Sequence, residues 1–97
     1  MTHIQLFERT GTFAENKDIA RDVRVMEILP ALAQGEYIVL DFSQIDGATQ
    51  SFVHALISEC FRVYGETTLD RLEFKGCSPA VREIILIVTE YMQEAGM

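Results

Sequence analysis

The feature that most restricts the fold is an almost unbroken apolar segment at residues 36–42, whose centre reads Tyr-Ile-Val-Leu. A strand with apolar side chains on both faces is typical of the middle of a parallel sheet, where neighbouring elements cover it. Parallel strands cannot be joined by a tight turn and need a crossover segment, usually a helix. The segment therefore predicts an α/β protein.

Segments with a helical pattern precede and follow this strand in the sequence. Apolar side chains recur every three or four positions at about residues 17–29, 50–64 and 79–93, which indicates three amphipathic helices. Asn16, Thr49 and Ser78 precede these segments and are suitable N-cap residues. Pro30 is expected either to end the first helix or to kink it, because it has no N–H to donate.

Two further segments alternate between apolar and polar residues, as half-buried strands do. They are residues 3–7 and 71–75, and a shorter strand is conceivable near residues 12–13. Asp46-Gly47 is a turn signal. The order strand, helix, strand, helix, strand, helix predicts a small α/β domain over residues 1–97, with a mixed central sheet and helices packed mainly on one face.

The charge and composition limit the kinds of partner and the cellular compartment that we expect for this protein. Eight basic and fifteen acidic residues give a net charge of −7, which disfavours nucleic acid and anionic membrane surfaces. The longest apolar run is residues 84–88, and the first five residues lack a signal-peptide pattern, so we expect no membrane span. Cys60 and Cys77 lack metal-ligand spacing and are expected to be reduced thiols in the cytoplasm, with Cys60 buried and inert.

The side chains that could carry chemistry are few. Ser51 and His54 are three positions apart on one helix, and Asp41 could complete a hydrolytic set, but no oxyanion motif accompanies them. Gly11 and Gly47 are isolated, so no phosphate-binding loop is present. We therefore expect no catalytic activity, no cofactor and no metal. Asp41 either presents a polar group at the binding edge of the sheet or accepts backbone N–H groups from the following loop.

The strand ending in Asp41-Phe42, followed by Ser51-Phe52 at a helix start, resembles the STAS-like domain family of bacterial proteins. This family is related to the STAS domain of sulphate transporters and anti-sigma factor antagonists. The resemblance extends over the order of elements in essentially the whole chain. It implies a regulatory role in which a partner protein binds near the start of this helix.

The resemblance also places Ser51 at the serine that a partner kinase phosphorylates in anti-sigma factor antagonists, within the motif Asp-Ser-Ser-Gly. This chain has Thr49, Gln50 and Phe52 at the other three motif positions, so it departs from the sequence that such a kinase recognises. A phosphate on Ser51 would be favoured by the helix dipole and would add a large negative charge.

The function predicted is a non-enzymatic regulatory module that binds a partner through residues 46–51 and the helix start. The resemblance implies a histidine-kinase-like ATPase or an anti-sigma-like protein as partner. Asp41, Asp46, Thr49, Ser51 and His54 are the expected contact residues, and Ser51 is the candidate phosphate acceptor. The alternatives are a constitutive assembly subunit without a switch and, more remotely, a small hydrolase that uses Ser51 and His54. The oligomeric state is left open.

Overall fold

The central strand lies where the sequence pattern predicts it. The computed structural model describes residues 1–95, and the strand β3 (Ile38–Asp41) is buried at every position. It is flanked by β1 (Thr2–Gln5) and β5 (Leu72–Lys75) in the order β1-β3-β5. Both neighbours pair with β3 in parallel, with Ile4 and Phe74 in register with Leu40.

The sheet is therefore parallel throughout, and the expectation of a mixed sheet was wrong. Helices carry the chain back between β1 and β3 and again between β3 and β5, so these three strands run the same way. No antiparallel hairpin interrupts this alternation within residues 1–95. The α/β class and the order of the main elements are confirmed.

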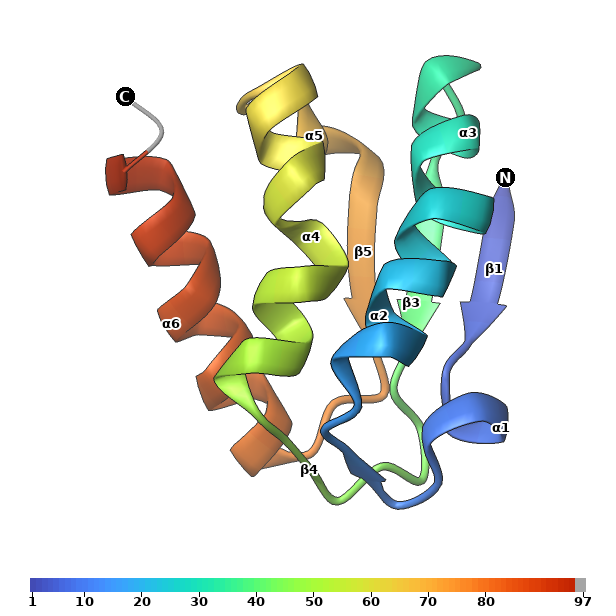
Figure 1. Cartoon of the computed structure of the whole chain (residues 1–97), viewed down its shortest axis with the longest axis vertical. Helices are drawn as coiled ribbons and strands as arrows, with labels where there is room; N and C mark the ends of the chain where they lie inside the picture. The colour runs from blue at the N-terminus through green and yellow to red at the C-terminus, as the bar shows by residue number, and fades with distance from the viewer. Residues whose placement is uncertain (96–97) are drawn as a thin grey trace.

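The helices form one layer on one face of the sheet, as expected (Figure 1). The elements of this layer and the short segments beside it are α1 (Phe7–Thr10), α2 (Lys17–Val23), a π-helical turn η1 (Arg24–Ile28), α3 (Leu29–Ala33), α4 (Gln50–Tyr64), α5 (Thr67–Arg71) and α6 (Pro79–Ala95). Asn16, Thr49 and Ser78 cap α2, α4 and α6 through their side chains, as predicted. None of the helices described is long and apolar enough to cross a membrane.

The hydrophobic core lies between this helical layer and the sheet. Ile4, Ile38, Leu40 and Leu72 point toward it from the strands, and Phe52, Val53, Leu56 and Ile57 fill it from α4. Each fully buried side chain of this size contributes roughly 1.5–3 kcal/mol by leaving water. The opposite face of the sheet carries exposed polar side chains, such as Gln5, Glu73 and Lys75.

Pro30 neither ends the first long helix nor leaves it regular. The chain stays helical to Ala33, and the turn immediately before the proline is widened into η1. Leu29 N–H donates to the Arg24 carbonyl, five residues back. A proline ring in a regular helix collides with the carbonyl four residues earlier, here that of Met26. The wider turn is one of the known ways in which a helix accommodates such a disruption.

A second, two-stranded sheet holds the loop that leads to α4. It pairs β2 (Phe13–Ala14) with β4 (Gly47–Ala48) in parallel. The turn predicted at Asp46-Gly47 is instead at residues 43–44, where Gln44 has a φ of 72°. Gly47 packs closely against Phe13, since a Cβ there would lie 3.0 Å from the Phe13 ring.

Cys60 is expected to be unreactive in the folded protein. It is fully buried on the inner face of α4, and burial raises the pKa of its thiol to about 11. Cys77 is only partly buried, although burial raises the pKa of its thiol as well. At pH 8 a thiol reagent should label Cys77 first and Cys60 only as the protein unfolds. Rapid labelling of a folded Cys77→Ser variant would contradict this result.

Candidate functional site

The segment at residues 46–51, predicted to contact a partner, is tied to the rest of the protein by backbone hydrogen bonds. Asp46 N–H donates to the Thr12 carbonyl at 2.7 Å, and Thr49 N–H donates to the Ala14 carbonyl at 3.0 Å. Ser78, which caps α6, donates its hydroxyl to the Asp46 carbonyl at 3.1 Å. The segment is thus held at the end of the molecule where α4 and α6 both begin.

Thr49 and Ser51 have different roles at the start of α4. Thr49 Oγ1 accepts the Phe52 N–H at 3.0 Å, so this hydroxyl caps the helix and is not a free contact group. Ser51 lies in the first turn with its side chain exposed, whereas Phe52 beside it is fully buried in the core. The phenylalanine in place of a motif glycine therefore anchors the helix start and leaves Ser51 on the surface.

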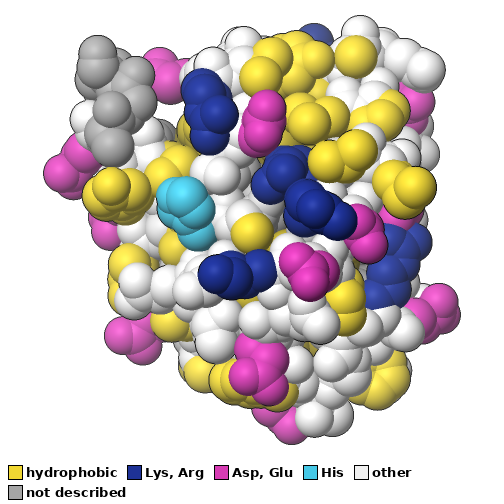
Figure 2. Space-filling view, viewed as in Figure 1, with side chains coloured by type: hydrophobic (Ala, Val, Ile, Leu, Met, Phe, Trp, Pro, Cys, Tyr) yellow, Lys and Arg dark blue, Asp and Glu magenta, His cyan; other side chains and the backbone are white. Residues whose placement is uncertain are grey.

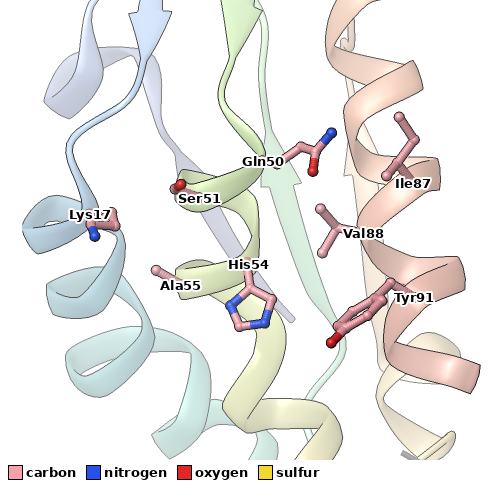
Figure 3. A pocket seen from close by; sticks show the side chains of 8 residues that line it. All are labelled: Lys17, Gln50, Ser51, His54, Ala55, Ile87, Val88 and Tyr91. Carbon is pink, nitrogen blue, oxygen red and sulfur yellow. The ribbon is translucent and has the colours of Figure 1, made fainter. Parts of the chain in front are cut away.

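Ser51 lines an open groove between α4 and its two neighbouring helices. The groove has a volume of about 510 Å³ and is lined by Lys17, Gln50, Ser51, His54, Ala55, Ile87, Val88 and Tyr91. Figure 3 shows Ser51 on the side of α4 that faces Lys17, while Gln50 and His54 lie toward α6. The His54 and Tyr91 rings are 6.5 Å apart between centroids and tilted by 50°. The groove thus combines a hydroxyl, an imidazole and an ammonium group with apolar side chains.

Basic side chains gather over the middle of the helical face, although the protein as a whole is acidic (Figure 2). Lys17 and Arg21 are exposed one turn apart on α2. Arg24 is more buried and donates to the Ala55 carbonyl at 2.7 Å, which fixes η1 against α4. Lys17 is therefore the cation available at the rim of the groove, beside Ser51.

Asp41 lies away from this groove, on the opposite face of the sheet. Its Oδ1 accepts the Ser43 N–H at 2.9 Å, and its Oδ2 lies 3.0 Å from Nε2 of His3. Gly76 allows this close packing, because a Cβ there would overlap the Ser43 hydroxyl. Asp41 thus holds the following loop, which was one of the two roles considered for it.

The structure does not bring the candidate hydrolytic residues together. Ser51 and His54 share the groove, but Asp41 is paired with His3 rather than with His54. The pairing of His3 with Asp41 was not predicted, because the contact depends on the register between β1 and β3. Within the described part of the chain, no three His, Cys, Asp or Glu side chains are grouped as metal ligands.

The wall that α6 contributes to the groove was not predicted from the sequence either. Ile87 and Tyr91 are exposed apolar residues outside the inward stripe of α6. Their position outside that stripe was the available signal, since apolar residues off the buried face of a helix can mark a contact surface.

Replacing Asp41 by Asn should lower the free energy of unfolding by about 1–3 kcal/mol at pH 7, because charge-assisted hydrogen bonds are lost. The Ser43 hydroxyl and N–H, followed by His3, hold the pKa of the Asp41 carboxyl below its usual 3.8. A lowered pKa stabilises the folded state above about pH 4, and this stabilisation disappears as the pH falls through the folded-state value.

Urea unfolding at pH 7 and pH 3 measures both effects, with exposed Asp70→Asn as the matched control. The Asp41→Asn protein should lose less stability between these two pH values than the wild type does. Equal stability of the Asp41→Asn and Asp70→Asn proteins at pH 7 would contradict the role assigned to Asp41.

The comparisons with known proteins agree with this architecture. Residues 25–82 match a family described as a STAS-like domain of unknown function. The matched range runs from η1 through β3, the groove residues of α4 and β5 to the first turn of α6. No curated protein and no solved structure matches the chain. The match covers more than half of the sequence, and the chain therefore belongs to the STAS-like domain family.

Proposed function

We propose that this STAS-like domain is a non-enzymatic regulatory module that binds a partner protein through residues 46–51 and the first turns of α4. The observation that carries the proposal is the exposed Ser51 hydroxyl at the rim of the groove between α2, α4 and α6. A partner that enters this groove covers Ser51. Any charge added to Ser51 then changes the binding energy directly.

The local electrostatics support a switch at this residue. The amides of Gln50 and Ser51 precede the first hydrogen bond of α4, which Val53 N–H donates to the Thr49 carbonyl at 3.2 Å. Free amides and the dipole of this 15-residue helix favour an anion at its start. Lys17 on the facing wall adds a positive charge. A phosphate on Ser51 is thus tolerated by the fold, while it changes the charge that a bound partner meets.

The second candidate function is a constitutive assembly subunit. The exposed apolar side chains of Ile87 and Tyr91 favour it, because they offer a contact that does not depend on the state of Ser51. The two functions differ in one measurable respect. Charge at Ser51 controls binding in the regulatory module and has little effect in the assembly subunit.

The Ser51→Asp variant should fold normally and bind the partner more weakly, by about 2–5 kcal/mol, because an unpaired charge is desolvated at the interface. Ser51→Ala should bind nearly as well as the wild type. The partner is first purified from the native host with tagged wild-type protein and identified by mass spectrometry. Its affinity for each variant is then measured by calorimetry.

Thr67→Asp is the matched control. Thr67 is exposed in the first turn of α5, at the far end of α4, so it adds the same charge to a helix start outside the groove (Figure 1). This variant should retain wild-type affinity. If Ser51→Asp also retains it, with an unchanged circular dichroism spectrum, the switch is refuted and the constitutive assembly subunit is favoured.

A further inference from the structure

The outer face of α6 carries apolar side chains that are not buried in the hydrophobic core. Val81, Ile85 and Val88 already fill the inward face of this helix. Ile87 and Tyr91 are nevertheless 41% and 60% exposed and form the α6 wall of the groove, across α4 from Ser51 (Figure 3). Clustered apolar side chains next to a concave surface are typical of a protein-binding site.

A row of glutamates runs along α6 beside these apolar residues. Glu83, Glu90 and Glu94 are exposed at helical spacings of seven and four, so they follow one stripe next to Ile87 and Tyr91. Among residues 1–95, none of these three carboxylates is in an ion pair. The last turn of α6 has no basic residue. Negative charge near a helix C-terminus is unfavourable, and so are like charges four residues apart.

The two sides of the groove therefore differ in charge. On the α6 side, Glu83, Glu90 and Glu94 flank the groove without lining it, and on the α2 side Lys17 lines it. Figure 2 shows basic side chains over the middle of the helical face, with acidic ones among them and along the edge where α6 lies. Glu83 and Glu94 are eleven residues apart, which corresponds to about 16 Å, or three helical turns.

We propose that this groove binds an amphipathic α-helix of a partner protein, with apolar residues against Ile87 and Tyr91 and Lys or Arg along the flank that faces the glutamate row. This inference rests on the proposed function and names the chemistry of its partner. A helix laid into an apolar groove is a recurrent mode of peptide recognition. Cations on its flank relieve the repulsion among Glu83, Glu90 and Glu94.

The charge of the protein also favours a basic helix over other kinds of binding partner. A second copy of this chain is disfavoured, because two molecules of net charge −7 repel each other. An anionic membrane and a phosphate backbone are disfavoured by the same glutamate row. A basic amphipathic helix is the occupant that satisfies the apolar wall and the acidic row together.

The test uses three fluorescent peptides of about 18 residues, a length at which an isolated helix begins to form in water. The first has leucines along one helical face and lysines along the flank, and the second has glutamates in place of the lysines. The third has the composition of the first in scrambled order. Fluorescence anisotropy should show that the wild-type domain prefers the lysine-flanked peptide by about tenfold or more over the other two.

A charge reversal with a matched control separates specific pairing from general attraction. Glu90→Lys with Glu94→Lys should abolish the preference for lysine over glutamate, because the row now repels a basic flank. Glu8→Lys with Asp70→Lys changes the total charge equally at exposed positions on α1 and α5, and it should leave the preference intact. Ile87→Ala with Tyr91→Ala should weaken binding of the lysine-flanked peptide by about tenfold.

Equal binding of the lysine- and glutamate-flanked peptides overturns the inference, as does an unchanged preference in the Glu90→Lys, Glu94→Lys protein. The native partner distinguishes this failure from failure of the proposed function. If Ser51→Asp releases that partner while the charge reversal on α6 does not, the regulatory site stands and the basic-helix assignment fails. If neither change releases it, both proposals fail.

Discussion

The burial of β3 between β1 and β5, under a single layer of helices, is the constraint on which the rest of the structure depends. Every position of β3 is buried, three of the four carry apolar side chains, and β1 and β5 flank the strand on its two edges. The crossovers then place α2, α4 and α6 side by side on one face of the sheet (Figure 1). The groove lies between these helices, so its geometry follows from the burial of one strand.

The main elements were predictable because their signals are local. The apolar run at residues 36–42 gave β3, and the side-chain caps Asn16, Thr49 and Ser78 gave the helix starts. The short helices α1 and α5 were not predicted, because four or five residues cannot show a helical period. The parallel pairing of all strands and the widened turn before Pro30 depend on how distant segments pack, which no local pattern reveals.

The candidate site was predictable only in part, for the same reason. The spacing of Ser51 and His54 placed them on one helix, and both are exposed on α4. The separation of Asp41 from these residues could not be predicted, because it depends on the face of the sheet from which the Asp41 side chain projects. The contribution of Ile87 and Tyr91 depends on how α6 lies against α4. The sequence thus identified the first turns of α4, and the fold supplied the opposite wall of the groove.

We propose that partners bind in the groove around Ser51, and nuclear magnetic resonance of the labelled domain can locate the binding surface residue by residue. The native partner is added stepwise, and the backbone amide shifts of the domain are followed. We expect the largest changes at Ser51, His54 and Tyr91, with little change at Gln5 and Glu73 on the uncovered face of the sheet. Large changes on that face, with Ser51 and Tyr91 unaffected, would show that partners bind elsewhere.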